Sequence, residues 1–229
     1  MPTRRQLADQ YLPTLFMVED VAPDDPVAVV AANIQGTAFV VDEPDGWLAT
    51  AKHVVDGLAA ADIRVRSVFS RGAPLLYGLG THRTVQRIVP HPDRDIALLK
   101  VAPQATAGRP VTFAGGTLSV GEDVILIGFA SGTDYVYCDE LLGDRSPKSP
   151  TPLVVHGITA ALVPHDGRPL ELYVTDLTTV GGNSGGPTIG VESGDIVALH
   201  IGGADHNGYG YALPIHLVLD FLAETKAAI

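Results

Sequence analysis

The feature that most restricts the fold of this chain is a series of short apolar runs, rich in β-branched residues and separated by Gly, Pro and Asp. Almost none of these runs places its apolar residues at helical spacing. Strands of this length and spacing are typical of an all-β barrel or sandwich. We therefore predict strands over residues 27–34, 36–42, 46–51, 62–69, 82–89, 95–101, 123–130, 152–163, 170–177, 187–191, 195–201 and 208–215.

Two segments depart from the β pattern. Residues 3–12 are predicted to form a helix with Thr3 as its N-cap, and residues 214–224 place apolar residues at helical spacing after a proline. The loop-like segment 102–116 separates six predicted strands from the six that follow, so we expect two β lobes. The predicted divisions are an N-terminal extension that includes the first helix (1–23), a first β lobe (24–102), a linker (103–116), a second β lobe (117–213) and a C-terminal helix (214–229). The polar segment 132–152 is predicted to be a long surface loop.

Composition excludes several classes of function. The 229 residues include 15 basic and 26 acidic side chains, for a net charge of −11, which repels phosphate backbones and anionic membranes. We expect no nucleic-acid partner and no membrane partner. The single cysteine, Cys138, excludes an intramolecular disulfide and a multi-cysteine zinc site. No histidines are paired at a spacing that suits zinc, so we predict no metal and no cofactor.

The start of the chain bears on location. The first residues, M-P-T-R-R-Q-L-A-D-Q-Y-L, contain two arginines with no apolar segment after them. No stretch of the sequence reaches the length of a transmembrane helix. We therefore expect a cytoplasmic protein.

One serine lies among four glycines in the segment G-G-N-S-G-G-P, residues 181–187. Glycine is kept where the backbone needs a positive φ or must come close to another group. An isolated segment of this kind is commonly a flexible turn between strands. The alternative is that Ser184 is a nucleophile whose neighbouring backbone N–H groups face a substrate oxygen, as an oxyanion hole requires.

Two further segments favour the second alternative. Residues 49–55 read A-T-A-K-H-V-V and residues 93–100 read D-R-D-I-A-L-L-K. A hydroxyl needs a base such as His53 to take its proton, and that imidazole needs a carboxylate such as Asp95 to fix its tautomer. Each residue alone is commonly structural, but the order His, Asp, Ser in a β-rich chain is specific.

These segments resemble those of chymotrypsin-fold (trypsin-like) serine proteases over residues 27–217. T-A-K-H is similar to the histidine motif of that family, D-I-A-L-L to its aspartate motif and G-N-S-G-G-P to its serine motif. The resemblance implies two six-stranded antiparallel β-barrels with His53, Asp95 and Ser184 in the cleft between them. It also implies an oxyanion hole formed by the N–H groups of Gly182 and Ser184.

The segment G-N-S-G-G also fits the nucleophile elbow G-x-S-x-G of α/β-hydrolases. That fold requires the order Ser, Asp, His and alternating helices, and this chain has the opposite order and reads as strands. We therefore set the esterase interpretation aside.

The residue before the serine departs from the digestive proteases. Those enzymes carry Asp there, which pairs with the N-terminus released by activation cleavage, whereas this chain has Asn183. An amide cannot form that ion pair, so activation by this route is not expected. The motif G-N-S-G-G-P is instead similar to those of HtrA-type proteases and glutamyl endopeptidases.

The segment A-L-H-I-G-G, residues 198–203, contains a histidine in an otherwise apolar strand. One interpretation is a core histidine that a backbone carbonyl satisfies. The other is that His200 lines the S1 pocket, with Thr179 five residues before the serine, and with Gly202. This pairing resembles glutamyl endopeptidases and the chymotrypsin-like cysteine proteases of small RNA viruses. Imidazole N–H and hydroxyl groups suit a P1 carboxylate or amide oxygen, so we predict cleavage after Glu or Gln.

The leading prediction is a serine endopeptidase that acts on a protein or peptide substrate. A second hypothesis is a latent or inactive protease-fold module for binding or signalling, which a regulatory protein partner switches on. A third is a protease of a bacterial defence or stress pathway. The sequence does not choose among them.

Overall fold

The structure of the protein, a computed structural model, describes residues 1–20, 34–67, 69–70, 73–74, 81–103, 111–129, 152–164, 169–203 and 208–229. The predicted strand over 27–34 lies outside these residues except for its last position. The predicted loop over 132–152, with Cys138, lies outside them except for its last residue.

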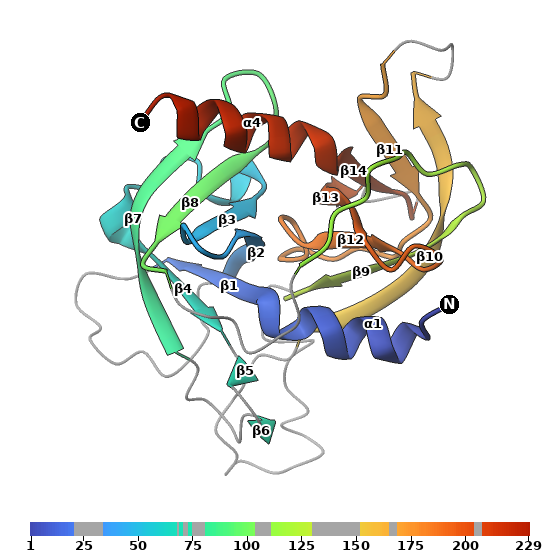
Figure 1. The fold of residues 1–229 in the computed structure, drawn as a ribbon, viewed down its shortest axis with the longest axis horizontal. Coiled ribbons are helices and arrows are strands. Elements are labelled where there is room, and N and C mark those ends of the chain that lie inside the picture. The colour runs from blue at the N-terminus through green and yellow to red at the C-terminus, as the bar shows by residue number, and fades with distance from the viewer. Residues whose placement is uncertain are drawn as a thin grey trace.

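The first six main strands close into an antiparallel barrel (Figure 1). The order around it is β1 (Leu15–Asp20), β2 (Ile34–Asp42), β3 (Trp47–Thr50), β8 (Ala97–Val101), β7 (Thr81–Pro90) and β4 (Ile63–Ser67). A separate two-stranded sheet pairs β5 with β6, Phe69–Ser70 with Ala73–Pro74. Short 3₁₀ turns span Leu12–Thr14, Lys52–Val54 and Ala60–Asp62.

Strand β1 was not predicted, because it falls within the residues assigned to the N-terminal extension. Its apolar residues are consecutive from Leu15 to Val18 and all are buried, so the alternation that marks a half-buried strand is absent. The first barrel therefore begins with β1, before the predicted boundary at residue 24.

The other six strands close into a second antiparallel barrel. The order is β10 (Leu153–Val163), β11 (Leu172–Thr175), β14 (Gly210–Pro214), β13 (Ile196–Gly203), β12 (Pro187–Gly190) and β9 (Asp123–Gly128). The prediction of an all-β fold with two six-stranded barrels is therefore confirmed.

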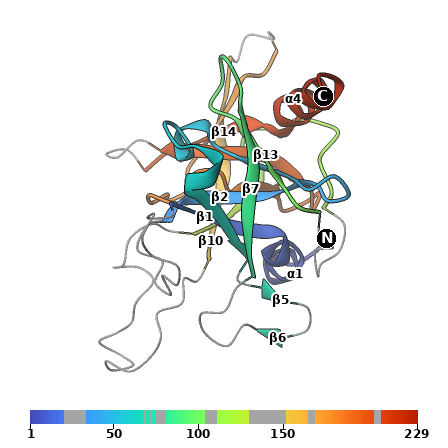
Figure 2. The same ribbon diagram turned by 90° about the vertical axis from the view of Figure 1, so that its left-hand side faces the viewer.

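In the described part of the chain, helices α4 and α1 lie on opposite sides of the strands, α4 above and α1 below in both views (Figure 1 and Figure 2). Helix α1, Arg4–Tyr11, begins with a capping box in which Thr3 and Gln6 exchange side-chain and backbone hydrogen bonds. Helix α4, Ile215–Ala227, follows β14 directly and has Pro214 as its N-cap. Both helices occupy positions expected from the sequence. No helix in the described part of the chain is long and apolar enough to cross a membrane.

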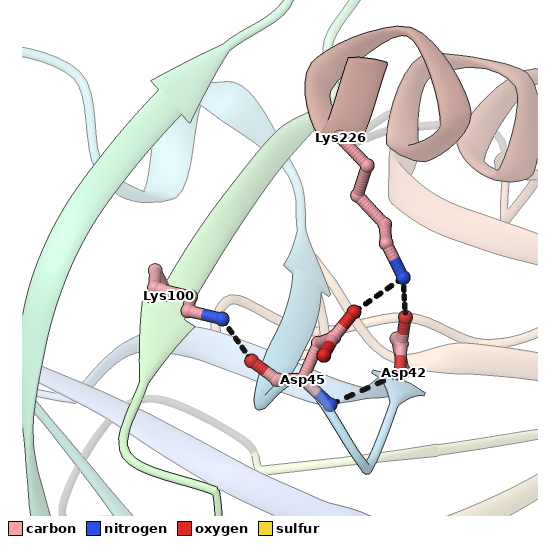
Figure 3. Close-up of polar contacts among 4 residues, drawn as sticks. All are labelled: Asp42, Asp45, Lys100 and Lys226. Atoms are coloured by element: carbon pink, nitrogen blue, oxygen red, sulfur yellow. Dashed lines mark hydrogen bonds and ion pairs between the residues drawn. The ribbon is translucent and has the colours of Figure 1, made fainter. Parts of the chain in front are cut away.

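Helix α4 belongs to the end of the chain but also contacts the first barrel. Lys226 Nζ lies 2.6 Å from Asp42 Oδ2 and also pairs with the carboxylate of Asp45, in the turn that joins β2 to β3 (Figure 3). Lys100 of β8 donates to the backbone oxygen of Asp45 in the same turn. The helix therefore ties the second barrel, which it follows, to the first.

The largest apolar cluster is shared by the two barrels. It includes Leu15 and Met17 of β1, Ile127 of β9 and Leu199 of β13, all completely or almost completely buried. A continuous apolar contact of this kind holds the barrels together by burial of area from both. This contact therefore fixes the positions of the two barrels relative to each other, including the barrel edges that carry the candidate site residues.

Candidate active site

His53 and Asp95 come from neighbouring strands of the first barrel. His53 lies in the 3₁₀ turn Lys52–Val54 directly after β3, and Asp95 lies just before β8. Strands β3 and β8 pair antiparallel with Thr50 opposite Ala97, so the end of β3 and the start of β8 meet at the same rim. The strand register thus places the two side chains side by side.

The carboxylate of Asp95 makes two hydrogen bonds to His53. Asp95 Oδ2 lies 2.7 Å from His53 Nδ1, and Asp95 Oδ1 accepts the backbone N–H of His53 at 2.9 Å. The hydrogen bond to Asp95 raises the pKa of His53 above its ordinary value, although burial opposes this. Burial alone would raise the pKa of Asp95, but the hydrogen bonds from the ring and backbone of His53 lower it overall. The arrangement fixes the ring with Nδ1 toward the carboxylate.

The turn that carries Asp95 is organised by His91. Its Nδ1 accepts the backbone N–H groups of Asp93 and Arg94, each at 3.0 Å. The ring meets Phe221 of α4 edge-on, with centroids 4.8 Å apart and an interplanar angle of 61°. Burial, followed by the charge of Arg94, lowers the pKa of His91. Nδ1 therefore stays an unprotonated acceptor for the two amides.

Ser184 lies in a tight turn that packs on β2 of the first barrel. The turn has positive φ angles of 88° at Gly182 and 87° at Gly185, which only glycine adopts readily. The carbonyl of Ser184 accepts the N–H of Thr37 at 2.8 Å. A Cβ atom at Gly185 would collide with the carbonyl oxygen of Thr37. The glycines are therefore required by conformation and by close approach, and the turn is held by partners in both barrels.

The amides of this turn differ in their hydrogen bonding. The N–H of Asn183 donates to the carbonyl of Val180 at 3.2 Å. Within the described residues, the N–H groups of Gly182 and Ser184 make no hydrogen bond. This is the state that an oxyanion hole needs before substrate binds. The described residues also contain no hydrogen bond between the hydroxyl of Ser184 and the ring of His53.

His200 is buried, with 1% of its surface exposed, and neither ring nitrogen has a hydrogen-bond partner among the described residues. The interpretation in which a backbone carbonyl satisfies the ring therefore finds no such carbonyl there. Burial, with a contribution from the charge of His53, lowers the pKa of His200 to about 4. The ring is neutral at pH 7 and has one N–H that a ligand oxygen could accept.

Thr179 and His200 converge on one glycine of β14. A Cβ atom at Gly210 would lie 2.7 Å from Thr175 Oγ1, 3.3 Å from His200 Cε1 and 3.3 Å from Thr179 Cγ2. These three side chains therefore surround the space over Gly210. Gly202, the third predicted substrate-binding residue, has φ of 140°, and no described residue lies within 4 Å of the position of a Cβ atom there.

Asn183 is also buried without partners. It is 1% exposed, and neither its side-chain oxygen nor its side-chain nitrogen has a hydrogen-bond partner among the described residues. Its Oδ1 lies close to the backbone of Gly128, 3.1 Å from the position a Cβ atom would take there. A buried unpaired amide costs free energy, so the turn beside Ser184 carries a local cost.

Sequence reasoning missed Thr37 and His91, the residues that hold Ser184 and Asp95 in place. The only signal for Thr37 is a polar residue within the apolar run G-T-A-F-V-V, and its partners lie far along the chain. His91 precedes Asp95 by four residues, a spacing that no simple pattern links to a turn cap. In the described part of the chain, no group of three or more His, Cys, Asp and Glu side chains could hold a metal ion.

A family model described as the trypsin-like peptidase domain matches residues 36–199 of this chain. The matched range contains His53, Asp95 and Ser184. Among curated proteins, a probable periplasmic serine endoprotease described as DegP-like, from Pseudomonas savastanoi pv. phaseolicola, is 28% identical over 207 residues. A putative serine protease, HhoA, from Synechocystis is 28% identical over 186 residues.

These alignments cover 84% and 79% of this chain but 35% and 40% of the two relatives. The chain therefore spans well under half the length of the curated relatives it matches. Among solved structures, a serine endoprotease from Yersinia pestis superposes with a TM-score of 0.66 at 18% identity, covering 98% of this chain and 66% of that one. The Rv3671c protein of M. tuberculosis in an inactive form superposes with a TM-score of 0.63 at 20% identity, covering 96% and 90%. These two likenesses show the same fold.

Proposed function

Because the chain belongs to the trypsin-like peptidase family, we propose that it is a serine endopeptidase with Ser184 as nucleophile, His53 as base and Asp95 as the group that orients His53. The observation that supports this most directly is that the carboxylate of Asp95 accepts hydrogen bonds from both the ring and the backbone N–H of His53. A carboxylate in this place selects the tautomer whose Nε2 is free to accept a proton.

In the proposed reaction, Nε2 of His53 takes the hydroxyl proton as Ser184 Oγ attacks the scissile carbonyl. The new oxyanion accepts hydrogen bonds from the N–H groups of Gly182 and Ser184, which have no other described partner. His53 then gives the proton to the leaving amine, and an acyl-enzyme remains. Water, activated by the same imidazole, releases the acid and restores Ser184. In free enzymes the nucleophile–base hydrogen bond is commonly long and shortens when substrate binds.

We propose that the P1 side chain is Glu or Gln. The unpartnered ring nitrogens of buried His200 support this choice, as does Thr179, whose methyl group lies with His200 over Gly210 and whose hydroxyl lies over Gly203. A site with a buried donor strongly rejects a substrate that cannot accept its hydrogen bond. Because Thr178 stands where a carboxylate would be needed for Lys or Arg, a basic P1 residue is disfavoured.

A latent module is the second candidate, and two observations favour it. The hydroxyl of Ser184 makes no hydrogen bond to His53 in the described residues, and the buried amide of Asn183 is unpaired. A regulatory protein partner that rearranges the turn around Ser184 would then complete the site.

The test is labelling with a fluorophosphonate probe, with the wild type beside Ser184→Ala and His53→Ala. Labelling of the wild type alone supports an assembled site, and peptides that vary only at P1 then test specificity. Poor cleavage of both the Glu and the Gln peptide by a labelled enzyme would refute the P1 proposal. A folded wild type that neither labels nor cleaves would favour the latent module.

A further inference from the structure

A residue of the first barrel makes two hydrogen bonds to the candidate nucleophile turn of the second. Thr37 of β2 is completely buried. Its backbone N–H donates to the carbonyl of Ser184 at 2.8 Å, and its hydroxyl donates to the carbonyl of Gly182 at 2.8 Å. One residue therefore holds both ends of the tripeptide 182–184.

The hydroxyl of Thr37 is fully used. It donates to Gly182 and accepts the backbone N–H of Phe129, just after β9, at 2.8 Å. The carbonyl of Thr37 in turn accepts the hydroxyl of Thr50 at 2.7 Å. Since donor and acceptor partners are fixed on both sides, the hydroxyl has one orientation. Burial strengthens such a connected set of hydrogen bonds.

The held carbonyls fix the peptide planes that directly follow Gly182 and Ser184 in the chain, so the amide of each of these residues adjoins a fixed plane. The N–H groups proposed to stabilise the oxyanion belong to Gly182 and Ser184, the residues whose carbonyls Thr37 holds. Gly182 has φ of 88°, and a glycine without a Cβ has other conformations open to it. A hydrogen bond on its carbonyl restricts those conformations. An oxyanion hole works only if its donors are aimed before the reaction begins.

We infer that Thr37 is a positioning residue of the oxyanion hole, in which its hydroxyl holds the carbonyl of Gly182 and thereby aims the amides of Gly182 and Ser184 at the reacting carbonyl oxygen. This inference rests on the proposed serine endopeptidase function. The first barrel supplies His53 and Asp95. Through Thr37 it would also position the turn around Ser184, which the second barrel supplies.

The test compares Thr37→Val with Thr37→Ser. Valine keeps the shape of the side chain and removes the hydroxyl, whereas serine keeps the hydroxyl. Because oxyanion contacts form mainly in the transition state, Thr37→Val is expected to lower kcat by about 10- to 100-fold with KM little changed. Thr37→Ser is expected to keep most of kcat. Amide hydrogen exchange of residues 181–186 is expected to be faster in Thr37→Val than in the wild type.

Thr188→Val is the matched control. Thr188 lies in β12 and is 1% exposed, and its hydroxyl has no hydrogen-bond partner among the described residues. The same chemical change there should leave kcat unchanged. Should Thr37→Val fail to fold, the smaller pair Thr37→Ser and Thr37→Ala makes the same comparison.

Three results would overturn the inference. They are a folded Thr37→Val that keeps its kcat, a Thr37→Ser that loses as much as the hydroxyl-free variant, and an equal loss in Thr188→Val. A wild type that neither labels nor hydrolyses peptides would instead refute the proposed function. In that case amide hydrogen exchange of residues 181–186 tests whether Thr37 positions the turn. Unchanged exchange in Thr37→Val would overturn the positioning role, and faster exchange would support it.

Discussion

Asp95 holds His53 at two points, since one carboxylate oxygen accepts the backbone N–H at 2.9 Å and the other lies 2.7 Å from Nδ1 of the ring. The first contact fixes where the 3₁₀ turn after β3 lies, and the second fixes how the imidazole is rotated. Both contacts depend on the antiparallel pairing of β3 with β8. The same carboxylate therefore fixes the position of the turn and the orientation of the imidazole.

The first prediction concerns Asp95→Asn. The amide would favour the tautomer of His53 in which Nε2 carries the proton and cannot accept one, so kcat should fall by about 10³- to 10⁴-fold. His53 must be neutral to act as a base, and its pKa is raised chiefly by Asp95. Activity of the wild type should therefore rise with pH through a pKa above 6.5, and this limb should move to lower pH in the variant.

Peptide hydrolysis measured from acid to neutral pH checks this prediction. Asp93→Asn is the control, since Asp93 lies in the same turn and its side chain has no hydrogen bond to His53. An acid limb that does not move in Asp95→Asn would show that Asp95 does not set the pKa of His53.

The second prediction concerns His200→Leu. Removal of two buried unpaired ring nitrogens should leave stability unchanged or increased, while the preference for Glu and Gln at P1 is lost. The pKa of His200 is about 4 in the folded protein against 6.5 as its ordinary value. Between these values the unfolded chain binds more protons, so the wild type loses stability as pH falls. The advantage of the variant in Tm should therefore grow as pH falls from about 6.5 toward about 4.

Thermal unfolding at several pH values and a P1 peptide panel give the two readouts. The control is His216→Leu, because His216 is exposed on α4 and its loss should affect neither. An unchanged P1 preference in His200→Leu would place the specificity pocket elsewhere.

The strand pattern made an all-β chain with two lobes predictable, because apolar runs bounded by Gly, Pro and Asp are local signals, and the resemblance to chymotrypsin-fold proteases implied that the lobes are six-stranded barrels. The turn around Ser184 could also be predicted, since positive φ angles at Gly182 and Gly185 leave a direct trace in the sequence. Thr37 stands out only as a polar residue in an apolar run, which does not predict its role, since its hydroxyl partner Gly182 is 145 residues away. Strand β1 was missed because its apolar run is short, carries no alternation and comes soon after the predicted first helix.

The third prediction concerns Gly210→Ala. The added methyl group would lie 2.7 Å from Thr175 Oγ1 and 3.3 Å from atoms of Thr179 and His200, so it must displace Thr175 and narrow the space that these residues border. A pocket that is shorter by one methyl group should lower kcat/KM for Glu and Gln substrates by about 10- to 200-fold, with less effect on a small P1 residue such as Ala. Gly116→Ala is the control, because nothing lies within 4 Å of a Cβ there. Equal losses for large and small P1 residues would indicate a folding defect instead of a filled pocket.

The fourth prediction compares His91→Asn with His91→Gln. The side-chain oxygen of Asn can accept backbone N–H groups two and three residues ahead, as Nδ1 of His91 does for Asp93 and Arg94. Gln is one methylene longer and does not suit this turn. We expect Asn to keep most of kcat and Gln to lose about tenfold, because Asp95 is displaced from His53. The pKa of His53, followed by NMR titration, should fall in the Gln variant only. Equal effects of the two substitutions would show that His91 acts by packing on Phe221 alone.

The fifth prediction concerns Lys226→Met, which keeps the apolar stem of the side chain and removes its charge. Hydrogen bonds to Asp42 and Asp45 raise the pKa of Lys226, and the pairing with Lys226 lowers the pKa of Asp45. The side chain of Lys226 is 41% exposed, so we expect a small loss of Tm that narrows as salt screens the pair. The difference in Tm should also narrow as pH falls through the lowered pKa of Asp45, where the carboxylate loses its charge.

Lys226→Arg is the control, because it keeps the charge and should behave as the wild type. In both variants kcat should not change, because Phe221 still packs on His91. A loss of Tm that is the same at low and high salt would show that the end of α4 is held by packing and not by its ion pairs.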